Sequence, residues 1–264
     1  MRLIDTHCHL VWREQENPPG PQLQRAREAG VERFICVATD LESATRCHRL
    51  AAAEKDVFAT VGIHPNDVGS AAQLEIELAK LAGMLTDQDW VAIGETGLDF
   101  FRDWAEPQLQ VRSLEQHLQL SCDTGLPVIL HCRNAMEGLL PVLENFAGKL
   151  SGVMHCYSDG PAPIERLLEL GFYISFAGNM TFPKSQDLRD AAAVVPQNRL
   201  LVETDAPFLA PQARRGKRNE PAFVAFTLQA LAKLRQVDAE ELALATSANA
   251  ARLFALEWSA ANKA

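Results

Sequence analysis

Histidines and carboxylates that can bind metal recur along this chain, and the first pair stands almost at its start. His7 and His9 are separated by one residue in the run Asp5-Thr6-His7-Cys8-His9. On a β-strand alternate side chains share a face, so both imidazoles would point the same way, about 6.6 Å apart along the backbone. Two imidazoles at that separation can converge on one metal ion. The pair alone is weak evidence, because ordinary surface or core histidines can have the same spacing.

Further side chains of the same kinds follow short apolar runs that we expect to be strands. They are Asp5, His64, Glu95, His131, His155, Glu203 and Asp205. Five of the seven histidines therefore fall at expected strand ends, which a random scatter would rarely produce. Imidazole suits Zn, Mn, Fe or Co, and carboxylates add the negative charge that two close cations need. Four histidines with two carboxylates thus suit a pair of divalent ions.

Glu95 is the candidate for the ligand that joins the two ions. Two metals about 3.5–4 Å apart need a bridging ligand. Glu95 alone interrupts an apolar strand end, and its neighbours Gly94 and Thr96 are small. An ion pair between Glu95 and an arginine or lysine is the alternative.

Three of the candidates are expected to support the site rather than to ligate metal. Asp5 can orient a ligand histidine, as carboxylates behind metal-bound imidazoles do. His64 can contact substrate or a ligand. Glu203 can likewise contact substrate or a ligand, or form a salt bridge inside the fold.

Cysteines adjoin three of the histidines, at Cys8, Cys132 and Cys156. Adjacent residues of a strand face opposite sides. We therefore expect these thiols to point away from the site and to pack as small apolar side chains.

One dense basic run, 213–221, stands in a chain whose formal net charge is −9. That charge argues against a broad basic surface for nucleic acid. In barrels, however, phosphate sites commonly follow strands seven and eight, where this run lies. Arg215 and Lys217 are therefore candidate phosphate ligands, as is Arg133 beside His131; a solvated loop is the alternative. Aromatic residues of the neighbouring loops can stack bases or simply pack: Phe100, Phe101, Trp104, Tyr157 and Phe182.

The elements that must position these residues alternate between strand and helix. After the first strand, which includes Leu3 and Ile4, strands are expected at 33–39, 57–63, 90–94, 127–130, 152–154, 172–176 and 200–202. Helices are expected at 21–29, 42–54, 71–85, 107–124, 135–146, 163–170, 185–195, 222–235, 238–245 and 247–256. Eight such rounds in 264 residues predict an α/β protein with a (β/α)8 TIM barrel, as a single domain over residues 1–264, with a doubly wound sheet as the alternative. In a barrel, the strand ends that carry the candidates form the rim where active sites assemble.

The composition is that of an ordinary globular protein, with 47% hydrophobic and 22% charged residues. No apolar run reaches the roughly 18–20 residues of a membrane span, and we expect no secretory signal, because only two apolar residues stand between Arg2 and Asp5. The six cysteines include no C-x-x-C pair, so we expect free thiols in a cytoplasmic protein. We expect a monomer with no obligate protein partner and no membrane contact.

The ordered motifs resemble those of the TatD family of metal-dependent deoxyribonucleases, within the amidohydrolase-like barrels. The matching motifs are DTHCHL from Asp5, GIHP from Gly62, GETGLD from Gly94, PVILH from Pro127, HCY from His155, VETDAP from Val202 and RGKRNEP from Arg215. The resemblance covers essentially the whole chain. It implies one metal held by His7, His9, Glu95 and Asp205, and another held by Glu95, His131 and His155.

The same resemblance implies hydrolysis of DNA phosphodiester bonds with Mg, Mn or Zn, often as a 3′→5′ exonuclease on single-stranded or damaged DNA. Glu95 and Asp205 would be catalytic, Asp205 by accepting a proton from the attacking water. Three residues depart from common family patterns, namely Val11, Asn134 and Met136. None is an expected ligand, so substrate preference is what these departures put in question.

Two other functions remain open. One is hydrolysis of a small ester, amide or phosphoester by a related amidohydrolase. Many such enzymes use a modified lysine on strand four, where this chain has Glu95. The other is a metal-holding scaffold that binds nucleic acid without cleaving it.

Overall fold

The computed structural model describes residues 1–87 and 89–258. Its eight described strands form one parallel sheet in sequence order. They are β1 (Leu3–Cys8), β2 (Val31–Cys36), β3 (Val57–Val61), β4 (Ala92–Asp99), β5 (Val128–Arg133), β6 (Gly152–Met154), β7 (Phe172–Phe176) and β8 (Leu200–Val202). The sheet closes between its first and last members, where the Asp205 N–H donates to the His7 carbonyl at 2.9 Å and the His9 N–H donates to Ala206 at 2.7 Å. The predicted (β/α)8 barrel is therefore confirmed.

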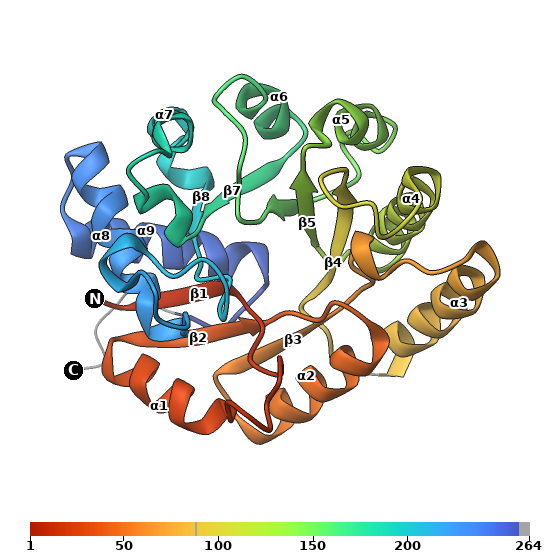
Figure 1. Ribbon diagram of the computed structural model, residues 1–264, viewed down its shortest axis with the longest axis horizontal. Coiled ribbons are helices and arrows are strands. Elements are labelled where there is room, and N and C mark those ends of the chain that lie inside the picture. Colours follow the sequence, from red (N-terminus) through yellow and green to blue (C-terminus); the bar gives the residue numbers. More distant parts are fainter. Residues whose placement is uncertain (88, 259–264) are drawn as a thin grey trace.

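Helices surround the strands, as Figure 1 shows. They are α1 (Pro19–Glu28), α2 (Leu41–Ala53), α3 (Ala71–Asp87), α4 (Pro107–Thr124), α5 (Met136–Glu144), α6 (Ile164–Glu169), α7 (Gln186–Val194), α8 (Val224–Arg235) and α9 (Ala239–Leu253). Short 3₁₀ turns lie between them: η1 (Pro65–Asp67), η2 (Gly178–Thr181), η3 (Gln197–Arg199), η4 (Gln212–Arg214) and η5 (Pro221–Phe223). No helix in the described ranges combines the length and apolarity that crossing a bilayer requires.

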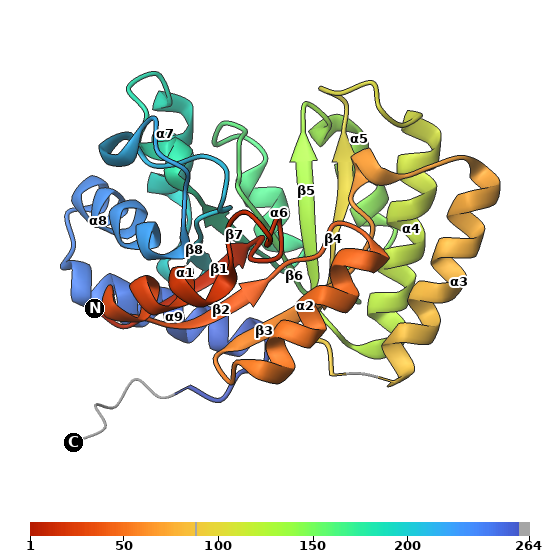
Figure 2. The same ribbon diagram turned by 60° about the horizontal axis from the view of Figure 1, so that its bottom comes forward.

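The core has two layers, which follow from the alternation of side chains along each strand. The larger layer lies between the strands and the helices and includes Leu3, Phe34 and Leu130. The smaller one fills the barrel interior with one residue or more from most strands, such as Ile4 and Ile129. The C-terminal part of α9 joins this inner layer through Leu253 and Phe254, and Figure 2 shows α9 beneath β1 and β2. The interior below the rim is thus apolar and filled.

Two predictions about the elements were wrong. The helices expected at 238–245 and 247–256 are one helix, α9, because nothing between them breaks the helix and Asp238 caps its start with hydrogen bonds from Glu240 and Glu241. Strand β4 does not end at Gly94 but continues to Asp99, paired with β5. Gly97 permits this pairing, since a Cβ there would lie 2.0 Å from the His131 carbonyl oxygen. Glu95 therefore lies inside a strand.

His117 shows why a histidine can be buried away from the site. It lies on α4, accepts a hydrogen bond at Nε2 from the Ile63 N–H (3.0 Å), and its Nδ1 lies 2.7 Å from the Ser113 carbonyl. Burial lowers the pKa of His117 to about 4, so the folded protein keeps the ring neutral.

His117 should therefore make stability depend on pH. The unfolded chain binds a proton at His117 below about pH 6.5, whereas the folded chain does so only near pH 4, so stability is lost as the pH falls through this window. Between pH 7 and pH 5, the free energy of unfolding should fall by about 2 kcal/mol more in the wild type than in His117→Gln. Urea denaturation of both proteins at the two pH values measures this difference. Parallel losses would show that His117 is not the group responsible.

Candidate metal centre

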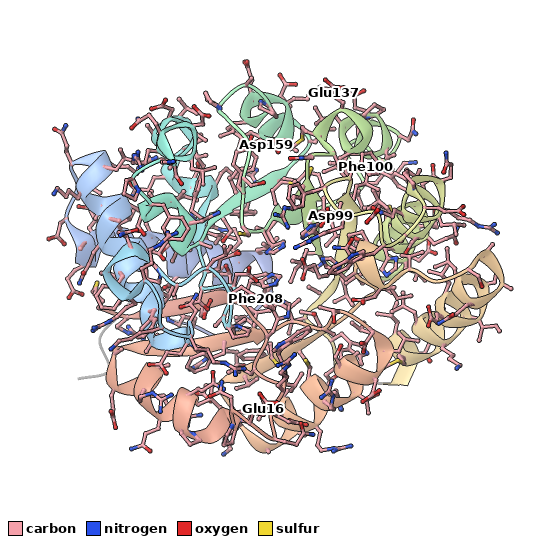
Figure 3. All side chains as sticks on the ribbon, in the orientation of Figure 1. Glu16, Asp99, Phe100, Glu137, Asp159 and Phe208 are labelled. Atoms are coloured by element: carbon pink, nitrogen blue, oxygen red, sulfur yellow. The ribbon has the colours of Figure 1, made fainter. Side chains whose placement is uncertain are left out.

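The candidate residues converge at the rim formed by the carboxyl ends of the strands. His7 comes from β1, Glu95 from β4 and His131 from β5, while His155 directly follows β6 and Asp205 lies in the loop after β8. Figure 3 shows this rim from above, with Asp99 marking one side of the cluster and Phe208 the other. The barrel thus gathers side chains that lie up to 198 positions apart between His7 and Asp205.

The first half of the cluster joins β1, β4 and the loop after β8. The Nε2 atoms of His7 and His9 are 3.1 Å apart. Glu95 Oε2 lies 3.4 Å from the first of them and 3.7 Å from the second. Asp205 Oδ1 lies 3.4 Å from His9 Nε2 and 3.8 Å from His7 Nε2. Two nitrogens and two carboxylate oxygens therefore face one common point.

The second half uses the other oxygen of the same glutamate. Glu95 Oε1 lies 2.7 Å from His155 Nε2 and 3.0 Å from His131 Nδ1. His64 Nε2 is also close, 3.5 Å from this oxygen. The two carboxylate oxygens of Glu95 therefore face two different pairs of histidines.

Three of these histidine rings have one nitrogen close to an oxygen atom outside the cluster, and their other nitrogen faces into the cluster. His9 Nδ1 lies 3.1 Å from the Val37 carbonyl, and His155 Nδ1 lies 3.2 Å from Glu203 Oε1. His131 Nε2 lies 3.2 Å from Asp99 Oδ2. In the neutral form of each ring, one of these oxygens accepts the N–H, and the other ring nitrogen directs its lone pair into the cluster. This donor set is the one that divalent transition metals bind.

Carboxylates and histidines lie next to each other in the cluster and shift each other's pKa. Burial would raise the pKa of Glu95, but the neighbouring histidines His155, His64 and His7 hold it well below its ordinary value. Burial would lower the pKa of His155, but Glu95 and Glu203 raise it well above its ordinary value. The carboxylates are thus anionic, and cations are favoured between them.

The histidines of the cluster differ from one another in proton affinity. Against the effect of burial, Asp205 raises the pKa of His9 to about 9. Burial and the nearby charge of His155 lower the pKa of His7, and burial lowers that of His64 to about 3. Any metal that binds these imidazoles must displace the protons they carry.

Asp99 belongs to the site and was missed by the sequence interpretation. Its Oδ2 contacts His131 and accepts a hydrogen bond from Asn66 Nδ2 at 2.9 Å. Although burial opposes it, the hydrogen bonds from His131 and Asn66 lower the pKa of Asp99, so the carboxylate is anionic. The sequence feature that could have identified Asp99 is its position four residues after Glu95. That spacing places both side chains on the rim only if β4 continues past Gly94.

Replacing Asp99 by asparagine should weaken metal binding at the His131 side of the site. Carboxylates that orient a ligand histidine typically contribute about 10- to 100-fold to metal affinity or activity. Titration with Mn²⁺ should show a loss of affinity of this size. The exposed Asp103→Asn change in the same loop is the matched control. Equal affinities in all three proteins would remove Asp99 from the site.

The supporting residues have different surroundings. Glu203 lies against His155, and His64 lies within the cluster, where its Nδ1 accepts a hydrogen bond from the Asn66 N–H at 3.1 Å. Asp5 does not face the histidine rings; it accepts hydrogen bonds from the Thr204 N–H and hydroxyl at 2.9 and 2.6 Å. A register shift between Asp5 and Cys8 breaks the regular alternation of β1 and explains this. Burial raises the pKa of Asp5 to about 8.

The six cysteines are free thiols, as predicted. Cys8 and Cys132 pack in the layer between strands and helices. Cys156 differs, because it follows the end of β6 with φ 42°. Burial and the charges of Asp205 and Glu203 raise the pKa of its thiol. The Cys156 sulfur accepts a hydrogen bond from Asn179 Nδ2 at 3.8 Å, so it does not pack as a purely apolar side chain.

The basic loop is tied to the site at one end. Asn219 is buried and donates from Nδ2 to the Thr204 carbonyl at 2.7 Å. Glu220 anchors the loop to α1, accepting hydrogen bonds from Arg25. Arg215 and Lys217 remain exposed, with the Arg215 guanidinium 4.7 Å from the centre of the Phe182 ring. These two side chains are thus accessible to a ligand at the rim.

The departures from the family pattern also lie near the rim. Val11 is buried in the loop between β1 and α1. Asn134 is exposed and has φ 53°, a conformation that asparagine tolerates better than most residues. Met136 is half-buried at the start of α5.

Comparison with known proteins agrees with this architecture. A family model described as "TatD related DNase" matches residues 4–255. An uncharacterized metal-dependent hydrolase of Escherichia coli K12, YcfH, is 38% identical over 266 residues, covering 98% of each chain. The 3′-5′ ssDNA/RNA exonuclease TatD of Erwinia tasmaniensis is 36% identical over 242 residues, covering 89% of this chain and 92% of its own. The crystal structure of YjjV, a TatD homologue from E. coli K12, has a TM-score of 0.90 at 33% identity and covers 97% of this chain and 98% of its own.

Proposed function

We propose that this chain, which belongs to the TatD family of metal-dependent hydrolases, cleaves DNA phosphodiester bonds with the help of two divalent metal ions. The observation that carries the proposal is the position of Glu95, whose two oxygens face separate histidine pairs. The named activity of the Erwinia relative supports a 3′→5′ direction on single-stranded substrate.

The ligands we assign follow the two halves of the cluster. His7, His9 and Asp205 would hold one ion, His131 and His155 the other, and Glu95 both. The donor chemistry fits, because imidazole nitrogens are directed inward and anionic oxygens lie between them. Mg, Mn or Zn are the ions we propose. When bound, they would supply Lewis acidity and lower the pKa of a water molecule towards about 7.

The chain's own residues then have separate tasks. Asp205 carries an anionic carboxylate at the rim, since His9 and His7 lower its pKa against the effect of burial. It accepts the proton of the attacking water. Arg133, Arg215 and Lys217 hold the phosphates of the strand, the arginines through paired hydrogen bonds. Asp99 and Glu203 keep His131 and His155 in place.

A time course on 3′- and 5′-labelled single-stranded oligonucleotides, with Mg, Mn and Zn tested separately, examines the proposal. We expect stepwise shortening from the 3′ end, which a chelator abolishes. Cleavage of small esters or amides without cleavage of DNA would favour an amidohydrolase instead. DNA binding without any product would favour a scaffold.

A further inference from the structure

Large apolar side chains that remain exposed gather at the rim rather than over the whole surface. Phe101 and Trp104, in the loop after β4, are 52% and 65% exposed. Trp12 and Phe208, in the loops after β1 and β8, are 40% and 43% exposed. Exposed aromatic rings grouped around one opening mark a binding surface more often than isolated ones do.

The loop after β4 arranges cations and rings alternately. The Arg133 guanidinium lies 3.8 Å from the centre of the Phe101 ring, and the Arg102 guanidinium lies 5.4 Å from the same ring. Arg102 also lies 4.9 Å from the Trp104 ring. We call these four residues the Phe101–Trp104 stack. Phe100 is not part of the stack, because its ring packs over Gly138 of α5. A Cβ added to Gly138 would lie 3.1 Å from the Phe100 ring.

A single carboxylate connects this stack to the metal centre. Asp99 Oδ1 accepts hydrogen bonds from the Phe101 and Arg102 N–H groups at 3.0 and 3.1 Å, while its Oδ2 contacts His131. The stack is therefore held in a defined position next to the second half of the cluster. A ligand that bridges the two would meet a preorganised surface.

A second aromatic pair lies beside the first half of the cluster. The Trp12 and Phe208 rings pack edge to face with centroids 5.5 Å apart, and the Phe208 centroid is 6.0 Å from that of His9. In Figure 3, Phe208 and the start of the β4 loop, marked by Phe100, lie on opposite sides of the rim. Aromatic surfaces thus flank the cluster on two sides.

We infer that a single strand of nucleic acid lies across the rim, with one base against the Phe101–Trp104 stack and another against Trp12 and Phe208. Rings that stack bases beside arginines that bind phosphates are the usual means of holding single strands without sequence preference. Local cations are also needed, because the formal net charge of the chain is −9. This inference rests on the proposed function and adds the residues that grip the substrate on either side of the cleaved bond.

The test compares a substrate with bases and one without. Kinetics are measured on an eight-residue oligothymidylate and on bis(p-nitrophenyl) phosphate, for the wild type, Trp104→Ala, Phe101→Leu and Trp12→Ala. The ratio of kcat/KM for the oligonucleotide to that for the small ester should fall about tenfold in each variant, since stacking contributes at this level per base. Ile76→Ala, which removes an exposed side chain on α3, is the matched control and should leave both activities unchanged.

Binding gives a second readout that does not need turnover. In a Glu95→Gln background, the oligonucleotide should quench tryptophan fluorescence, and Trp104→Ala should remove much of that quenching. Cleavage of the oligonucleotide by the wild type with unchanged ratios in the variants would overturn the inference and leave the proposed function standing. Quenching through Trp104 without cleavage by the wild type would support the inference and overturn the proposed function. Neither binding nor cleavage would overturn both.

Discussion

Replacement of Glu95 by glutamine is expected to lower kcat/KM for DNA cleavage on the order of a thousandfold. The amide keeps the size of the side chain but removes the charge from the point where the two histidine pairs meet, 2.7 Å from His155 and 3.4 Å from His7. Without an anion there, two cations would repel each other at close range. The measurement is steady-state cleavage of a labelled oligonucleotide together with the metal content after equilibration with Mn²⁺.

Glu203→Gln is the matched control for this prediction. It makes the same chemical change at another buried carboxylate, which lies at hydrogen-bond distance from His155 and within 4.8 Å of a ring nitrogen of His7. We expect a loss of about 10- to 100-fold, because Glu203 orients a ligand. A Glu95→Gln protein that retains two ions and near-normal cleavage would exclude Glu95 as the bridge.

Asp205→Asn should lower turnover far more than it lowers DNA binding. Removal of a general base typically reduces kcat by about 10²- to 10⁴-fold. Binding depends instead on phosphate and base contacts made by other residues, so the dissociation constant for DNA should change little. Single-turnover cleavage and fluorescence anisotropy with the same labelled oligonucleotide separate the two effects.

Metal loss must be distinguished from loss of the base in this variant, because Asp205 also lies 3.4 Å from His9. Bound metal is therefore measured in parallel, and kinetics are run at saturating Mn²⁺. Asp187→Asn, on the exposed side of α7, controls for the removal of one negative charge. Turnover close to that of the wild type would remove Asp205 from the mechanism.

The barrel and the candidate residues are readable in the sequence because both are local properties. Short apolar runs separated by helix-forming segments specify parallel β-α units, and the helix 107–124 is observed as predicted. The types of His7, His9, Glu95, His131, His155 and Asp205, together with their places within or just after short apolar runs, also need no knowledge of long-range contacts. Closure of the barrel then brings them together.

Other features depend on contacts between distant segments, which periodicity does not report. The continuation of β4 to Asp99 requires pairing with β5, and that pairing brings Asp99 to His131. The turn of Asp5 towards Thr204 follows from a register shift in β1, and the contact of Cys156 with Asn179 joins the segments that follow β6 and β7. The meeting of Trp12 with Phe208, 196 positions later, likewise exists only once β1 and β8 close the barrel. Residue type thus determines which chemistry is possible, whereas strand register and barrel closure decide which side chains come together in one site.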